Sequence, residues 1–432
     1  MSATAPLKHS VSAQTGKVRN FRWYICGLLL YATTVNYMDR MVLSILKPTI
    51  GRDLHWTDEQ YGWINAVFQL GYAVMMPIAG RLIDWLGLRA GYSAATLIWS
   101  LSSMSHALAR TVTQFAVARL GLGLGEAANF PACLKAVADW FPRHERALAT
   151  GIFNGGSNLG AVLAPLAVPF ITARYGWQMS FIFTGSLSFS WVILWLLIYR
   201  EPEQHPWLSR DELSLIRSDQ EEITTATIPY SKLLVTRAGL AFLAGKVLTD
   251  PVWWFYLFWL PDFLHRKYGV DLLHLGAPLI AVYAASAGGS IAGGWLSSSL
   301  LARGWTVARA RKTAMLVCAI TVGAVILVPS AAGNLWLTVA LIGIAAASHQ
   351  GWMANLFTVP SDCFPRAAVA SVVGLGGVGG AVGGMLAQPL IGKWLDISGD
   401  AYAPLFVMAG SMYLIALLVI HLLLPRFEKV RI

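Results

Sequence analysis

Asp39 and Arg40 place an acid and a guanidinium side by side in VNYMDRMVLS, a stretch flanked by long apolar segments. Further ionisable residues lie deep inside other apolar stretches and come in two pairs. They are Arg119 with Glu126, and Lys246 with Asp250. A charge at the centre of a bilayer costs ~2.5–3.5 kcal/mol even on lenient scales. If these stretches cross a membrane, the charged side chains must therefore face a shared polar interior.

The helical spacing of these residues indicates which of them share a face. Arg119, Gly123 and Glu126 recur after four and then three residues, so both charges lie on one stripe of a helix. Asn36 stands one turn before Arg40 and extends the same face. The spacing therefore predicts two polar stripes, one on each helix.

Adjacent residues on a helix point about 100° apart, so Asp39 and Arg40 cannot easily pair with each other and each needs a separate partner. Lys246 and Asp250 are four residues apart and can satisfy each other. For this last pair, a purely structural role and a role in a charge network are both open.

The buried acids and bases are equal in number, so their charges sum to zero. A monoanionic substrate that enters beside a guanidinium makes such a site net negative, and a nearby like charge raises the pKa of a carboxylate. Protonation of one carboxylate then restores neutrality. This arrangement favours coupled uptake of an anion with a proton, although a sodium ion could play the same part.

Polar and aromatic residues in the second half of the chain suit a hydroxyl-rich ligand. The segment SHQGWMAN places His349, Gln350 and Asn355 within two turns of a helix, and hydroxyl recognition needs such donors and acceptors. Packing between helices is the alternative role for His349. Trp253 and Trp254 are adjacent, so at most one of them faces the same cavity, and we predict that it is Trp253.

The composition indicates which elements position these residues. The chain has 432 residues, of which 56% are hydrophobic and only 12% charged, whereas soluble domains are about a quarter charged. About 20 apolar residues make one membrane span. The sequence predicts an all-α membrane protein whose spans lie near 22–48, 58–82, 88–108, 112–138, 147–171, 178–199, 238–264, 274–302, 312–331, 334–359, 367–394 and 402–424.

The formal net charge of +10 is a signal of topology. Most of the 32 Lys and Arg residues lie in alternate loops, and the positive-inside rule then places both termini in the cytoplasm. This distribution excludes a nucleic-acid partner as the reason for the basicity. The four cysteines have no paired spacing, so we expect neither disulfides nor a metal site.

The twelve predicted spans divide into two groups on either side of the most polar segment, 200–237. FPRHERALATG at 141–151 matches FPRAAVASVVG at 364–374, each before an equivalent span. The predicted organisation is a cytoplasmic tail (1–21), a six-helix bundle (22–199), a cytoplasmic linker (200–237), a second six-helix bundle (238–424) and a tail (425–432). Such repeats are typical of alternating access around a central site. Within the linker, Ser209 and Glu212 have capping-box spacing for a short helix, in what we expect to be a solvated segment.

GRLIDWLGLR resembles the signature of the major facilitator superfamily between its second and third helices, with Gly80, Asp84 and Arg89 at motif positions. The resemblance implies the superfamily's twelve-helix fold, and it implies a gating role for these residues. Trp85 stands where a basic residue is common, and Ser298 replaces the acid in the second copy of the motif. Any lock from this motif should therefore be weaker in the second half.

Longer segments, among them NYMDR and TDPVWWFYLFWLP, resemble the anion:cation symporter family, and within it the bacterial hexuronate transporters. The resemblance implies proton symport of glucuronate or galacturonate across a bacterial inner membrane. It implies proton coupling by Asp39 and Glu126, substrate carboxylate binding by Arg40 and sugar contact by Tyr72. Some hexuronate relatives lack the acid at Asp39, so galactonate, glucarate or a small carboxylate is an alternative substrate.

A membrane enzyme or a sensor is the alternative from another class. An enzyme would need a nucleophile with a base, or a metal cluster, and the polar residues within the spans offer neither. A sensor would need a soluble signalling domain, and the longest segment outside the spans is short. We expect a transporter that is not an enzyme, has no cofactor other than the proton as coupling ion, and works as a monomer in the lipid bilayer.

Overall fold

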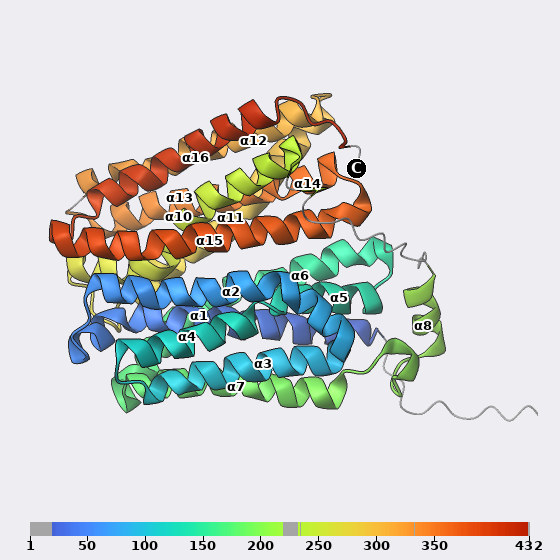
Figure 1. Cartoon of the computed structure of the whole chain (residues 1–432), viewed down its shortest axis with the longest axis horizontal. Helices are drawn as coiled ribbons and strands as arrows, with labels where there is room; N and C mark the ends of the chain where they lie inside the picture. Colours follow the sequence, from blue (N-terminus) through green and yellow to red (C-terminus); the bar gives the residue numbers. More distant parts are fainter. Residues whose placement is uncertain (1–19, 219–231, 234, 332, 431–432) are drawn as a thin grey trace, which may run out of the picture.

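A computed structural model describes residues 20–218, 232–233, 235–331 and 333–430. Within these residues the chain is helical and has no strand. Figure 1 shows α1 to α7 in the lower part of the view and α10 to α16 in the upper part, and we call these groups the N half and the C half. The small helix α8 lies at one end of the molecule. We call this end the α8 end and the opposite one the far end.

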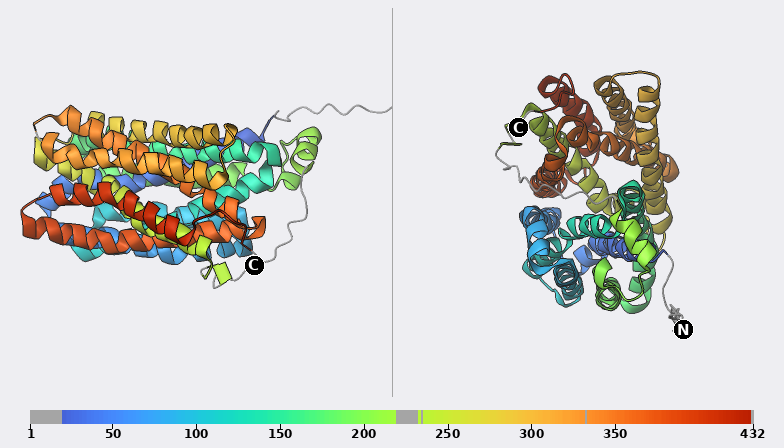
Figure 2. Two further views of the ribbon diagram at one scale, coloured as in Figure 1. Left: turned by 90° about the horizontal axis from the view of Figure 1, so that it is seen from above. Right: turned by 90° about the vertical axis from the view of Figure 1, so that its right-hand side faces the viewer.

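The helices of the N half follow one another with short connections. They are α1 (Arg22–Asp53), α2 (Asp58–Leu86), α3 (Leu88–Ser105), α4 (Val112–Glu126), α5 (Asn129–Trp140), α6 (Arg143–Tyr175) and α7 (Trp177–Ile198). The linker contributes α8 (Arg210–Arg217). The C half comprises α10 (Arg237–Tyr268), α11 (Gly276–Ala302), α12 (Val307–Val322), α13 (Leu335–Leu356), α14 (Thr358–Cys363), α15 (Arg366–Ser398) and α16 (Ala403–Leu423). Figure 2 shows the two halves side by side when the α8 end faces the viewer.

Eight of the described helical segments are long and apolar enough to cross a membrane. They correspond to α2, α6, α7, α11, α12 with the following 3-10 segment, α13 with α14, α15 and α16. The long helices α1 and α10 lie outside this set, and both hold several charged residues. The prediction of an all-α membrane protein is therefore confirmed.

Two predicted spans each consist of two helices, and the division lies near the middle of the first span and close to the end of the second. The span 112–138 consists of α4 and α5, and the span 334–359 consists of α13 and α14. Pro131 and Pro360 each lie just inside the second helix, where the ring clashes with the carbonyl four residues earlier, at Ala127 and Leu356. The breaks come in equivalent spans of the two halves but at different depths, because Pro131 lies ten residues before Phe141 and Pro360 lies four residues before Phe364. The first one leaves Glu126 at the end of its helix.

The linker helix α8 is docked on the N half. Ser209 accepts a hydrogen bond from the backbone N–H of Glu212, so the predicted helix start is confirmed. The Glu212 carboxylate accepts from the backbone N–H groups of Phe21 and Arg22 and pairs with the Arg22 guanidinium at 2.9 Å. Glu212 therefore caps the start of α1. The expectation of a solvated segment is wrong for α8, while 219–231 lie outside the described residues.

Helices α2 and α15 join the two halves through glycines. A Cβ added at Gly62 would lie 2.4 Å from the carbonyl oxygen of Gln388, and one at Gly392 would lie 2.2 Å from that of Asp58. Because these are backbone atoms, no rotamer change relieves such a clash. The two helices therefore touch through their backbones over the part of their length nearest the far end, and this contact holds the halves together there.

Replacement of Gly289 by leucine is expected to destabilise the C half. A Cβ at this position of α11 would lie 2.0 Å from the carbonyl oxygen of Ala347 on α13, and overpacking of this kind costs ~1–3 kcal/mol or more. We expect a clear fall in the melting temperature of the purified protein in detergent. The matched control is Gly288→Leu, because nothing lies within 4 Å of a Cβ there. Equal melting temperatures for the two variants would contradict this packing.

Candidate functional site

The structure brings Arg40 and Glu126 together in a buried ion pair between α1 and α4. Nε and Nη2 of Arg40 both donate to Oε2 of Glu126, at 3.0 and 2.7 Å. Their side chains are 4% and 0% exposed, which marks a charge pair taken fully out of water. Oε1 of Glu126 has no hydrogen-bond partner among the described residues. Oε1 of this carboxylate can therefore accept a further hydrogen bond.

Four aromatic rings surround the Arg40 guanidinium. Cζ of Arg40 lies 4.7 Å from the ring centroid of Tyr37, 5.3 Å from that of Tyr72, 5.4 Å from that of Phe68 and 5.3 Å from that of Trp254. The faces of such rings attract a cation, so they hold the guanidinium without neutralising it. We call these four rings the aromatic box. It receives residues from α1, α2 and α10, and therefore from both halves.

Sequence reasoning identified only Tyr72 of the aromatic box. Tyr37 lies three residues before Arg40, and Phe68 lies four residues before Tyr72, so both were detectable as neighbours on the same helix faces. Trp253 was predicted to share a cavity with His349 and stacks on that ring, while its neighbour Trp254 lies beside Arg40.

Arg119 and Asn36 support Arg40 from two sides. Both terminal nitrogens of Arg119 donate to the backbone carbonyl of Arg40, at 3.3 and 3.2 Å. Oδ1 of Asn36 accepts from Nη2 of Arg40 at 3.4 Å. The predicted stripes of α1 and α4 therefore face each other, and Arg119 binds the α1 backbone while Glu126 binds the side chain.

Asp39 lies apart from this pair, inside the N half. Its carboxylate accepts hydrogen bonds from Ser103 on α3 and Ser188 on α7, each at 2.6 Å, and the residue is 1% exposed. The separate partners of Asp39 and Arg40 agree with their divergence on the helix. A single polar interior shared by all the buried charges is not what the structure shows, because Asp39 has its own hydroxyl-lined pocket.

Lys246 and Asp250 pair with each other along α10 at 2.6 Å. Oδ2 of Asp250 lies against Gly380 of α15, where an added Cβ would be 1.9 Å away. The ion pair satisfies Oδ2 of Asp250, whereas Oδ1 has no hydrogen-bond partner among the described residues, so both roles stay open. The pair also fixes how closely α10 and α15 approach.

The predicted hydroxyl-binding residues of α13 occupy different environments. The His349 ring stacks on Trp253 with centroids 5.0 Å apart, and its Nδ1 shares a hydrogen bond with the hydroxyl of Tyr413. Gln350 is half-buried. Asn355 donates to the carbonyls of Gly293 and Gly351 at 3.0 and 2.9 Å, so its amide nitrogen ties α13 to α11. This packing contact uses only the amide nitrogen, while Oδ1 of Asn355 has no hydrogen-bond partner among the described residues, so the predicted contact of Asn355 with a ligand stays a prediction.

The motif at the end of α2 contacts only its own half. Asp84 pairs with Lys135 on α5, and Arg89 donates to the backbone carbonyl of Leu196 on α7. Gly80 has nothing within 4 Å of an added Cβ. All these contacts are at the α8 end, and they brace the N half without crossing to the C half.

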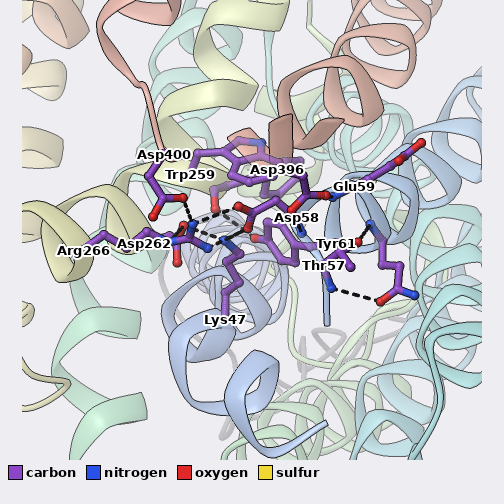
Figure 3. A network of polar contacts seen from close by, with 12 residues as sticks. Lys47, Thr57, Asp58, Glu59, Tyr61, Trp259, Asp262, Arg266, Asp396 and Asp400 are labelled. Atoms are coloured by element: carbon purple, nitrogen blue, oxygen red, sulfur yellow. Dashed lines mark hydrogen bonds and ion pairs between the residues drawn. The ribbon is translucent and has the colours of Figure 1, made fainter. Parts of the chain in front are cut away.

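A network of ion pairs joins the halves at the far end (Figure 3), and sequence reasoning missed it. Lys47 of α1 bridges Asp58 of α2 and Asp262 of α10, at 2.5 Å each. Arg266 of α10 makes two hydrogen bonds to Asp58, at 2.9 and 2.7 Å, and pairs with Asp262 at 2.9 Å. Tyr402 also donates to Asp262 at 2.8 Å. We call these five residues the interhalf network.

The N-terminal cap of α2 is a further link between the two halves at the far end. The backbone N–H groups of Asp58 and Glu59 donate to the Asp396 carboxylate of α15, at 2.9 and 2.8 Å. An acid at a helix N-terminus satisfies free N–H groups and complements the helix dipole. Here the acid comes from the other half. The halves are therefore closed on each other at the far end.

The described residues include no group of three or more His, Cys, Asp or Glu side chains that could hold a metal ion. The site is instead a buried guanidinium paired with one carboxylate. This arrangement suits recognition of an organic anion, because a second carboxylate can compete with Glu126 for the same nitrogens.

Comparison with known proteins agrees with this geometry. The family model of the Major Facilitator Superfamily matches residues 29–357. A hexuronate transporter of Escherichia coli (strain K12) is 32% identical over 424 residues, which cover 96% of this chain and 97% of that protein. A galacturonate transporter of Dickeya chrysanthemi is 36% identical over 59% of this chain and 75% of its own length. The fold resembles a bacterial homolog of the human lysosomal transporter Spinster, with a TM-score of 0.72, 19% identity and coverage of 94% of this chain and 97% of that one.

Proposed function

The chain belongs to the Major Facilitator Superfamily, and we propose that it imports a sugar-acid anion, such as glucuronate or galacturonate, by proton symport. The resemblance to bacterial hexuronate transporters seen in the sequence is confirmed by the relatives that match nearly the whole chain. The single observation that carries the proposal is the Arg40–Glu126 pair inside the aromatic box. It offers one cation to one carboxylate, as the binding of a monoanion requires.

Exchange of partners at Arg40 supplies a route to coupling. While Glu126 is ionised it occupies two nitrogens of Arg40. Protonation of Glu126 weakens this pair and frees the guanidinium for a substrate carboxylate, so that proton and anion enter together and the buried charge stays balanced. Release of either one restores the original pair and favours release of the other. Asp39 is the second proposed carrier of a proton, held by its two serines.

Alternating access requires that the two halves open at one end at a time. In the described conformation the interhalf network and the α2–α15 contact close the far end. The ion pairs at the α8 end, Asp84 with Lys135 and Arg311 with Asp362, each stay within one half. With α8 in the cytoplasm of a bacterial inner membrane, as the basic loops predict, the conformation is closed toward the outside.

Uptake into proteoliposomes tests this proposal directly. Radiolabelled glucuronate and galacturonate should accumulate in vesicles that contain the purified protein when an inward proton gradient is applied, and a proton uncoupler should abolish the accumulation. An equivalent sodium gradient without a proton gradient should have no effect. Protein that is active in exchange of another organic anion, such as galactonate, glucarate or a small carboxylate, but transports neither hexuronate would favour the alternative substrates.

Asp39→Asn should uncouple transport without unfolding the protein. The asparagine has the size of the aspartate and still accepts one serine hydroxyl, but it cannot gain or lose a proton. We expect accumulation driven by a proton gradient to fall at least about tenfold, while exchange of labelled for unlabelled substrate continues. Both are measured in the same vesicle preparation. If accumulation persists at the wild-type level, Asp39 carries no proton in the cycle.

A further inference from the structure

Gln69 is a fully buried amide with unused hydrogen-bonding atoms. It lies on α2, is 1% exposed, and neither Oε1 nor Nε2 has a hydrogen-bond partner among the described residues. Buried polar groups are almost always bonded, because an unbonded one has lost water without a replacement. An amide with both ends free therefore indicates a partner that arrives at another stage of the transport cycle.

The position of Gln69 connects it to the Arg40 site. It lies directly after Phe68 and three residues before Tyr72, and both of these rings contact the Arg40 guanidinium. Three residues of a helix span about 4.5 Å, so Gln69 is within the length of a six-carbon acid whose carboxylate lies at Arg40. Its own side chain faces α15, where a Cβ added at Gly384 would lie 2.2 Å from Oε1.

Two more amides continue this polar surface toward the far end. Asn65 lies one turn before Gln69 on α2, and its Oδ1 has no partner among the described residues. Gln388 lies one turn after Gly384 on α15. Its Oε1 accepts from the indole of Trp259 at 2.7 Å, while its Nε2 has no described partner. The contact between α2 and α15 thus presents both free donors and free acceptors at the boundary between the halves.

We propose that Gln69 is a specificity-determining residue that binds a hydroxyl group of the substrate while Arg40 holds its carboxylate. An amide both donates and accepts, as a hydroxyl group does, whereas a second carboxylate would require a cation. The site therefore selects polyhydroxy monocarboxylates over dicarboxylates. This inference rests on the proposed function and adds to it the residue that distinguishes a sugar acid from a plain organic anion.

The position of Gln69 also links substrate recognition to the contact between α2 and α15. Gln69 faces α15 of the other half, so a hydroxyl group bound by its amide lies where α2 and α15 meet. A substrate with the matching hydroxyl satisfies the amide as the helices close, whereas an acid without it leaves the amide unbonded. The hydroxyl group is therefore recognised at the same helix contact that closes the far end.

Kinetics of Gln69→Leu and Gln69→Asn test the inference. The leucine keeps the approximate volume and removes both hydrogen-bonding atoms, and the asparagine keeps the amide on a shorter side chain. We expect Gln69→Leu to raise KM for glucuronate, galacturonate or both about tenfold, with Vmax within about threefold of the wild type. Gln69→Asn should give an intermediate KM. Uptake is measured in proteoliposomes under a fixed proton gradient.

The matched control is Gly392→Ala, which crowds the Asp58 backbone in the same α2–α15 contact but touches no free amide. It should change Vmax and leave KM within about twofold. KM values of Gln69→Leu within twofold of the wild type for both acids would overturn the inference, and so would an equal rise of KM in Gly392→Ala. Failure of the wild-type protein to transport either acid would overturn the proposed function, which is a different result.

Discussion

Arg40→Ala is expected to abolish uptake, with a fall of at least about 100-fold at low substrate concentration. Truncation of one partner of a buried charge pair costs ~2–5 kcal/mol, and each 1.4 kcal/mol is a tenfold change in affinity. Arg40 is 3% exposed and holds the guanidinium within the aromatic box. Measurement of initial uptake rates in proteoliposomes, at equal amounts of reconstituted protein, gives the size of the effect.

The substitution also leaves Glu126 buried without its cation, which by itself costs ~3–5 kcal/mol of stability if the carboxylate stays ionised. The double variant Arg40→Ala with Glu126→Gln removes this second effect. We expect the double variant to regain much of the melting temperature lost in the single variant, while uptake stays absent. Recovery of uptake together with stability would show that Arg40 serves only to neutralise Glu126.

Arg40→Lys separates charge from geometry at the same position. Lysine keeps the positive charge, but it cannot offer the planar pair of nitrogens that Glu126 now accepts. We therefore expect activity between that of the wild type and that of Arg40→Ala. The ranking of the wild type, Arg40→Lys and Arg40→Ala by uptake rate shows whether the substrate carboxylate needs two hydrogen bonds from a guanidinium or only a positive charge.

Helical periodicity predicted from sequence which buried residues share a face of α1 and which share a face of α4. Arg119 and Glu126 lie on one stripe, and Asn36 and Arg40 lie on the other, because residues three or four apart share a face in any helix. The divergence of Asp39 from Arg40 followed from the same geometry. Such inferences need only the local helix and no knowledge of its neighbours.

The partners of Asp39 were beyond this reasoning. Ser103 and Ser188 come from α3 and α7, and serines are frequent in apolar helices, where many bond to their own backbone. Which serine turns toward an acid depends on how three helices pack together. The role of Trp254 was missed for the same reason, because Trp253 and Trp254 both lie on α10 and only packing decides which ring reaches Arg40 and which stacks on His349.

The interhalf network was missed because its residues stand at helix ends. Lys47, Asp58 and Arg266 fall at or beyond the boundaries of predicted spans, where charges are normally solvated and mark topology. Only the meeting of two halves distant in sequence converts them into a buried cluster. The side chains of Lys47 and Asp262 are 5% and 2% exposed, whereas that of Arg266 is 29% exposed, so the cluster is buried at Lys47 and Asp262 and reaches the surface at Arg266.

Asp262→Asn is expected to open the far end. Asp262 accepts from Lys47, Arg266 and Tyr402, so loss of its charge weakens the links between α1 of the N half and α10 of the C half. Breaking a buried, hydrogen-bonded charge pair costs ~2–5 kcal/mol, which shifts a two-state equilibrium at least about 30-fold. The shift should favour the conformation in which α2 and α15 separate.

Spin labels at Arg52→Cys on α1 and Ile397→Cys on α15 report this opening as a longer distance between the halves, since both positions are exposed and the four native cysteines are buried. The matched control is Asp271→Asn, because Asp271 is an exposed acid in the loop after α10 that pairs only within that loop, with His274, among its described contacts. Its distance distribution should equal that of the labelled parent. If Asp262→Asn also leaves the distribution unchanged, the interhalf network does not hold the far end closed, and the backbone contact of α2 with α15 must be what resists opening.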